Sequence, residues 1–162
     1  MFQRGSRRWS VAPSIAVSAW ILCGGLGVST ARARGVSTEQ EETIATIRTI
    51  AIAIESFGVE EDRYPGPTDG VVDIDYLKKV LVPSYLKRPN WDDGWQRRLR
   101  FLSDGTHYTI VSYGKDGKPD VEDWGDGDYD EGKLRERMCG GPVAGAERDI
   151  VFMDGQFCQY PE

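Results

Sequence analysis

The fold of this chain is decided by the stretch IATIRTIAIAIESFGVEEDRYP, which covers residues 44–65. Its apolar side chains recur at helical intervals, at Ile44, Ile47, Ile50, Ala51, Ile54 and Phe57. Pro65 cannot continue a helix, and it also disfavours the helical conformation for Tyr64. The stretch therefore predicts one amphipathic helix that ends near Gly58, followed by an acidic turn and a sharp change of direction.

The segment before this helix has the pattern of a cleavable export signal. Arginines at positions 4, 7 and 8 precede a mostly apolar stretch, and Ala31-Arg32-Ala33 forms a small-x-small cleavage site. We expect a signal peptide over 1–33, a polar lead-in over 34–42 and a globular domain over 43–162, with Thr38 capping the helix. The alternatives are a retained membrane anchor and lipid attachment at Cys23.

Charge narrows the classes of partner. The whole chain has a net charge of −6, and loss of residues 1–33 would change it to −10, because they hold four arginines and no acids. Such an acidic domain repels nucleic acid and anionic lipid, so we expect no nucleic-acid partner and a membrane contact only through a retained N-terminal segment. The expected location is periplasmic or extracellular, with membrane anchoring as the alternative.

The rest of the chain predicts a small antiparallel sheet. The expected elements are a short helix over Tyr76–Leu81, a hairpin of Arg98–Leu102 and Tyr108–Tyr113, and a strand over Asp149–Met153 that returns through Phe157 and Cys158. The stretches 115–131 and 140–145 are rich in glycine or acidic residues and are predicted to be loops. The fold class is therefore α+β: one long N-terminal helix packed on a small antiparallel sheet, with a loop-rich C-terminal part.

Two cysteines follow the predicted signal, Cys139 and Cys158. An even pair in an oxidising compartment is typical of a disulfide, and we predict that these two are bonded.

This order of features resembles the globular domain of the type II secretion pseudopilins, in particular the major pseudopilin, protein G. The resemblance is carried by Glu55-Ser56-Phe57, Asp62-Arg63-Tyr64-Pro65, Tyr85-Leu86-Lys87, the hairpin from Phe101 to Tyr113, Ser112–Gly117 and Asp149-Ile150. It implies a pseudopilin-like fold and a non-enzymatic role through contacts with secretion machinery or with further copies of the chain. The family's prepilin junction and long apolar core helix have no counterpart here, and its Asp-Pro-Trp-Gly turn is altered to Asn90-Trp91-Asp92-Asp93-Gly94-Trp95.

The acidic stretch after the hairpin is the candidate metal site. The resemblance implies calcium, with ligands at Asp116 and Asp149, and the position of Asp123, Asp126 and Asp128 in the same loop adds these three. Calcium takes six to eight oxygen ligands, which a loop rich in aspartate and glycine supplies. An EF-hand does not fit, because the required glycine comes one residue late and the closing acidic position falls on an arginine. The alternative is a solvated acidic loop that binds no metal.

Enzymatic chemistry has little support in the sequence. His107 is the only histidine, so neither a zinc site built on several histidines nor a histidine-based triad is expected. Carboxylates are plentiful, and a small hydrolase that uses a pair of them is the enzymatic alternative. We predict a protein that is not an enzyme.

Overall fold

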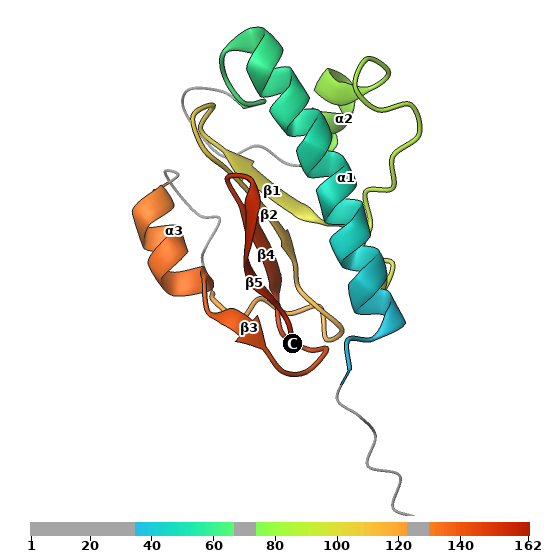
Figure 1. The fold of residues 1–162 in the computed structure, drawn as a ribbon, viewed down its shortest axis with the longest axis vertical. Helices are drawn as coiled ribbons and strands as arrows, with labels where there is room; N and C mark the ends of the chain where they lie inside the picture. The colour runs from blue at the N-terminus through green and yellow to red at the C-terminus, as the bar shows by residue number, and fades with distance from the viewer. Residues whose placement is uncertain (1–34, 67–73, 123–129) are drawn as a thin grey trace, which may run out of the picture. The chain divides into compact units, whose positions relative to one another are not determined.

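The computed structural model describes residues 35–66, 74–122 and 130–162. Its elements in chain order are α1 (Thr38–Glu61), α2 (Ile74–Leu81), β1 (Arg100–Ser103), β2 (Tyr108–Ser112), α3 (Glu131–Met138), β3 (Gly141–Val143), β4 (Ile150–Met153) and β5 (Gln156–Pro161). The strands form one sheet in the order β1-β2-β4-β5-β3, antiparallel except for the parallel pair of β3 and β5. Helix α1 runs along one side of the sheet and α3 lies on the other (Figure 1). The predicted α+β arrangement is confirmed.

The start of α1 is set by a cap that differs from the predicted one. The side chain of Ser37 accepts a hydrogen bond from the Gln40 N–H at 3.3 Å, and the Gln40 side chain accepts one from the Ser37 N–H at 2.8 Å. This reciprocal pair is a capping box, which satisfies two N–H groups that would otherwise lack partners. Thr38 is therefore the first helical residue, not the cap, and most of the predicted lead-in belongs to the helix.

The end of α1 also differs from the prediction. The helix continues through Gly58 to Glu61 and stops at Asp62, which has a left-handed backbone with φ of 55°. A proline removes the hydrogen bond to the carbonyl four residues earlier, and its ring clashes with that same group. For Pro65 that carbonyl belongs to Glu61, so the proline limits the helix one turn later than expected.

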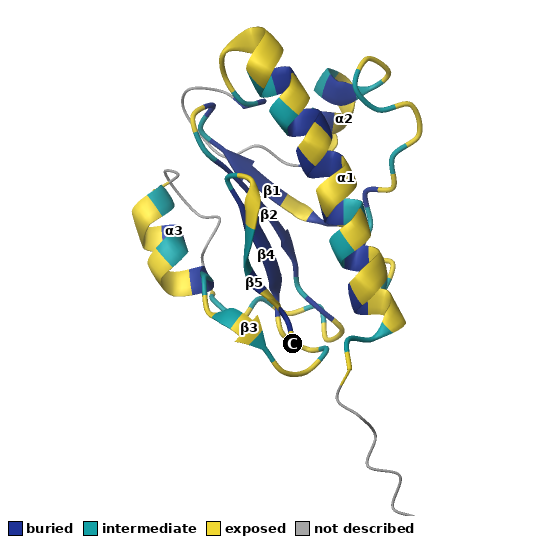
Figure 2. Cartoon of the chain, in the orientation of Figure 1, coloured by how far each residue is buried: buried dark blue, intermediate teal, exposed yellow. Residues whose placement is uncertain are grey.

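The two faces of the sheet carry separate apolar clusters, because side chains alternate along each strand. One cluster joins the predicted face of α1 and α2 to one face of the sheet, through Ile47, Ile50, Ile54, Leu77, Phe101, Tyr108, Ile110 and Phe152 among others. The second cluster packs Leu134 and Met138 of α3 against the opposite face, at Leu102, Val111, Val151 and Met153. Buried strands lie between exposed helix surfaces (Figure 2).

The predicted strands are confirmed, and two further elements appear that were not predicted, α3 and β3. The first hairpin pairs Phe101 with Ile110, and β4 and β5 form the predicted C-terminal hairpin. Within 140–145, however, β3 pairs in parallel with β5. The predicted acidic loop ends at Asp130, whose side chain accepts from the Lys133 N–H at 3.0 Å and caps α3.

Candidate functional site

The predicted ligand Asp149 lies at the start of β4, where it forms a reciprocal pair with Asp120. The Asp120 N–H donates to Asp149 Oδ2, and the Asp149 N–H donates to Asp120 Oδ2, each at 2.9 Å. Gln159 of β5 donates from Nε2 to Asp120 Oδ2 at 2.9 Å and to the Asp149 carbonyl at 3.0 Å. These bonds fix the loop after β2 against the end of the sheet. Asp120 and Gln159 were not among the predicted site residues.

One oxygen of Asp149 is not used by this network. Asp149 is 1% exposed, and its Oδ1 has no hydrogen-bond partner among the described residues. Asp149 lines a small cavity of about 160 Å³ together with Asp120, Arg137, Arg148 and Gln159. A buried carboxylate oxygen without a partner costs free energy, so this atom marks the place where a ligand would be stabilising.

Charged groups of both signs surround Asp149, because Arg137 and Arg148 line the same cavity as Asp120. Burial raises the pKa of the Asp149 carboxyl to about 7, and the negative charges of Asp120 and Asp116 add to the rise, while the Asp120 N–H and the Arg148 charge oppose it. Arg148 Nε lies 3.3 Å from Asp120 Oδ2, but its side chain is about half exposed. A cation in the cavity would relieve the electrostatic cost of ionising Asp149.

The other predicted ligands divide into two groups. Asp116 is exposed and accepts from the Lys118 N–H at 3.0 Å, and it is close enough to affect the pKa of Asp149. Asp123, Asp126 and Asp128 lie outside the described residues. Within the described part of the chain, no group of three or more histidine, cysteine, aspartate or glutamate side chains is arranged to hold a metal ion. The unpartnered oxygen and its acidic neighbours nevertheless fit a hard cation that binds through oxygen.

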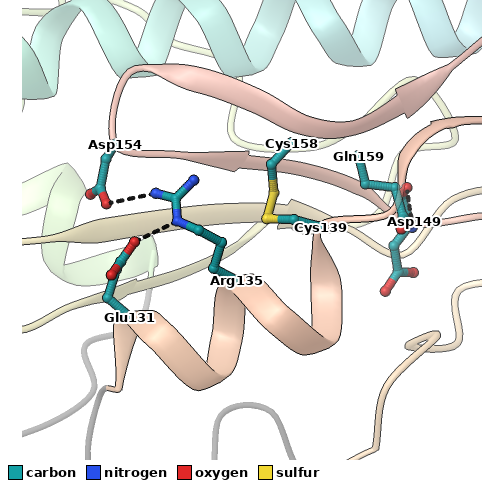
Figure 3. The surroundings of a disulfide bond; sticks show 7 residues. All are labelled: Glu131, Arg135, Cys139, Asp149, Asp154, Cys158 and Gln159. Atoms are coloured by element: carbon teal, nitrogen blue, oxygen red, sulfur yellow. Dashed lines mark hydrogen bonds and ion pairs between the residues drawn. A yellow bond between two sulfur atoms is a disulfide. The ribbon is translucent and has the colours of Figure 1, made fainter.

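The predicted disulfide lies beside this pair and is confirmed. Cys139 follows α3, Cys158 lies on β5 directly before Gln159, and their Cα atoms are 4.7 Å apart. Figure 3 shows Arg135 of α3 extending between two carboxylates, Glu131 on its own helix and Asp154 in the β4–β5 turn, the latter at 3.6 Å. The disulfide and the ion pair thus fasten α3 to the hairpin that carries Gln159.

The single histidine joins two turns. His107 Nδ1 lies 3.1 Å from Asp154 Oδ2, and the His107 N–H donates to Asp104 Oδ1 at 2.7 Å. Asp154 also accepts from the Tyr108 N–H at 2.8 Å. These contacts hold the tip of the first hairpin against the turn between β4 and β5, which is a structural use of the histidine.

Comparison with known proteins places most of this chain within one family. The family model described as type II secretion system (T2SS), protein G matches residues 32–127, which is more than half of the chain. No significant match is found among curated proteins or among solved structures. The match ends before α3, the disulfide and β3 to β5. Among the described residues, no helix is both long and apolar enough to cross a membrane.

Proposed function

Because the chain belongs to the type II secretion system protein G family, we propose that it is a non-enzymatic pseudopilin-like domain that works outside the cytoplasm through protein contacts. The observation that carries the proposal is the family match, which spans α1, α2 and the first hairpin. Membership of a pseudopilin family implies a multi-protein machinery and a location that is exported or membrane-associated. The proposed partners are components of that machinery or further copies of the chain.

Gene deletion tests the role in secretion. We expect a strain that lacks this chain to accumulate type II secretion substrates inside the cell, and a plasmid copy to restore their release. The control compares a strain that lacks a known core component of the machinery with a strain that lacks both that component and this chain. We expect the two strains to release equally little substrate, because both proteins act in the same machinery. Unchanged release of every substrate after deletion of this chain would contradict the proposal.

The proposal includes removal of residues 1–33 and release of the domain from the membrane. Its support is the sequence pattern of a positive segment, an apolar segment and Ala31-Arg32-Ala33. Mass spectrometry of the protein purified from the cell envelope and medium tests it, with an N-terminus at residue 34 as the expected result. An intact N-terminus in the membrane fraction would instead favour a membrane-retained minor component.

We further propose that the domain binds calcium through Asp149 and Asp116, with Asp120 beside them. The support is the unpartnered buried oxygen of Asp149 and its two acidic neighbours, Asp120 and Asp116, whose charges raise the pKa of the Asp149 carboxyl. When bound, the ion would neutralise these carboxylates and draw the loop after β2 toward β4. The loop would then present a single conformation to protein partners.

Thermal unfolding in calcium and in chelator tests this site. A ligand that binds only the folded state stabilises it by about 2.7 kcal/mol at a concentration of one hundred times Kd, so we expect millimolar calcium to raise Tm by several degrees. Asp149→Asn is expected to abolish the rise while leaving Tm in chelator close to that of the parent protein, because the amide removes a buried charge. Asp75→Asn, at an exposed position of α2, is the control and should keep the full rise. The absence of any shift in the parent protein would contradict calcium binding.

A further inference from the structure

The Cys139–Cys158 disulfide joins two walls of the cavity beside Asp149. One wall is the end of α3, where Arg137 lines the cavity two residues before Cys139. The other wall is β5, where Gln159 lines the cavity directly after Cys158. Figure 3 shows the bond, with Gln159 beside it and hydrogen-bonded to Asp149. The covalent bond therefore limits how far the two walls can separate.

The side-chain amide of Gln159 is fixed on three sides. A glutamine amide has two N–H donors and one carbonyl oxygen. Gln159 Nε2 donates to Asp120 Oδ2 at 2.9 Å and to the Asp149 carbonyl at 3.0 Å, which uses both donors. Gln159 Oε1 faces Gly140, the residue after Cys139, where a Cβ atom would lie only 2.8 Å from it. A reversed amide would place its oxygen against two acceptor oxygens, so the observed orientation is the stable one.

Gln159 in turn sets the position of the unpartnered carboxylate oxygen. Its two bonds add to the reciprocal pair of Asp120 and Asp149, in which the Asp120 N–H occupies Asp149 Oδ2. The oxygen left for a cation is therefore Asp149 Oδ1, which has no hydrogen-bond partner among the described residues. Replacing a residue that orients a metal ligand through hydrogen bonds commonly weakens metal binding about ten- to hundredfold. Gln159 has this relation to Asp149.

The other contacts at the end of α3 are less rigid restraints. The Arg137 guanidinium donates to the Glu122 carbonyl at 2.9 Å, but Arg137 is exposed. Arg135 lies 3.6 Å from Asp154 in an ion pair, and its side chain is 38% exposed. Water and salt weaken such exposed contacts, and apolar packing beneath the helix has no preferred direction. Among these restraints, the disulfide alone sets a fixed separation between the end of α3 and Gln159.

We propose that Gln159 is the positioning residue of the calcium site and that the Cys139–Cys158 disulfide holds it there, so that the domain binds calcium tightly only while this bond is closed. Opening the bond frees the end of α3 from β5, and Gln159 then loses its contact with Gly140. The inference deepens the proposed calcium site and rests on it. Helix α3, the disulfide and Gln159 all lie beyond residue 127, so this support comes from the part of the chain that the family match does not cover.

Calcium titration by calorimetry, in the full chain with Cys23→Ala, tests the role of Gln159. We expect Gln159→Met, which keeps a side chain of similar length but removes both N–H donors, to weaken calcium binding about ten- to hundredfold. Gln156→Met, at an exposed position of the same strand, is the matched control and should keep the parent Kd. Circular dichroism shows that each variant is folded at the temperature of the titration, so that a loss of affinity is not a loss of the fold.

The double variant Cys139→Ser with Cys158→Ser tests the disulfide in the same titration. We expect it to bind calcium about tenfold more weakly than the parent, because Gln159 is no longer held beside Asp149. A bond that only stabilised the fold would lower Tm and leave Kd unchanged, since the titration measures binding to the folded state.

A second measurement keeps both native cysteines and therefore does not depend on the folding of that variant. Dithiothreitol reduces the disulfide to two thiols by supplying two electrons and two protons, and it closes into a cyclic disulfide itself. In mixtures of reduced and oxidised dithiothreitol, saturating calcium should favour the closed bond by about tenfold, the same factor by which the bond tightens calcium binding, because coupling between two sites is reciprocal. Mass spectrometry of alkylated thiols measures the ratio in calcium and in chelator.

Two results would overturn the inference and leave the calcium site in place: an unchanged Kd in either folded variant, or a thiol equilibrium that calcium does not shift. Absence of calcium binding by the parent chain would overturn both the calcium site and this inference. The role in secretion is tested separately by gene deletion, which depends on neither result.

Discussion

Gly114 is a residue whose missing side chain allows two loops to meet. Its φ is +60°, and a Cβ atom there would lie 2.6 Å from the Arg148 carbonyl oxygen and 2.8 Å from that of Ala146. The Ala146 carbonyl also accepts from the Lys115 N–H at 2.7 Å, so the opposing loop cannot move away without losing that bond. We expect Gly114→Ala to lower the free energy of unfolding by about 3 kcal/mol, from left-handed strain and overpacking together, as measured by urea denaturation.

Gly141 provides the matched control for that prediction. Its φ is +76°, but a Cβ atom there would meet nothing within 4 Å. Gly141→Ala should therefore cost only the backbone strain, about 1 kcal/mol. Equal losses in the free energy of unfolding for the two substitutions would show that the close approach at Gly114 does not contribute to the loss.

The hydroxyl of Tyr108 connects the sheet to α1 inside the core. Tyr108 is fully buried and donates to Glu55 Oε1 at 2.6 Å, and burial together with this carboxylate raises the pKa of the phenol. Tyr108→Phe should lower the free energy of unfolding by about 1.5–3 kcal/mol, because hydrogen bonds to charged groups are the stronger ones. Tyr64→Phe removes a longer bond, 3.1 Å, from a partly exposed side chain and should cost less. Guanidinium denaturation measures both, and the reverse order would contradict this account.

At the scale of residues, the disulfide could be predicted from the sequence, because Cys139 and Cys158 are the two cysteines that follow the predicted signal. Asp149 was singled out because it stands directly before an apolar strand, and its role as a metal ligand stays a prediction. Asp120 and Gln159 were missed, because their roles come from contacts across 29 and 39 residues that no local pattern records. The stretch Lys118-Pro119-Asp120 was the one local signal for Asp120, since it places another carboxylate beside the predicted ligand Asp116.

At the scale of elements, the beginning of α1 depends on the side chain of Ser37. Its hydroxyl and the Gln40 side chain each satisfy a backbone N–H at the first turn. Ser37→Ala should lower the free energy of unfolding by about 1 kcal/mol. Thr38→Ala is the control, because residue 38 already lies inside the helix and alanine has the higher helix propensity. A larger loss from Thr38→Ala in urea denaturation would restore Thr38 as the cap.

The elements that could be predicted are those with a strong local period. Residues 44–57 repeat at helical spacing, and the second strand of the first hairpin is rich in β-branched and aromatic residues and follows a turn with Asp104-Gly105. Helix α3 has only two buried apolar residues, Leu134 and Met138, at the end of a charged run, so its period is too weak to recognise. Strand β3 is stabilised by its parallel pairing with β5. Such a pairing joins segments that are distant in the chain, so no local sequence pattern in either segment predicts it.

At the scale of the whole domain, the sheet unites the part that matches the family with the part that does not. Strand β4 lies beyond the matched residues, yet it is paired between β2 and β5 and all four of its residues are buried. Val151 and Met153 belong to the cluster beneath α3, while Ile150 and Phe152 belong to the cluster beneath α1. Each face of the sheet therefore depends on residues that follow the family match.

A chain that ends at residue 127 should consequently fail to fold, although it contains the whole family match. It would lose the four buried side chains of β4, worth about 1.5–3 kcal/mol each, and leave β2 with an unpaired apolar edge. That loss is comparable with the total stability of a typical domain, about 5–15 kcal/mol. Circular dichroism on heating should show no cooperative transition, whereas Glu162→Gln, which changes only an exposed side chain, should leave Tm within about a degree of the full chain, since isolated surface changes have small effects. A cooperative transition near the parent Tm in the shortened chain would mean that α1, α2 and the first hairpin form an independent unit, and that the C-terminal strands are an addition to it.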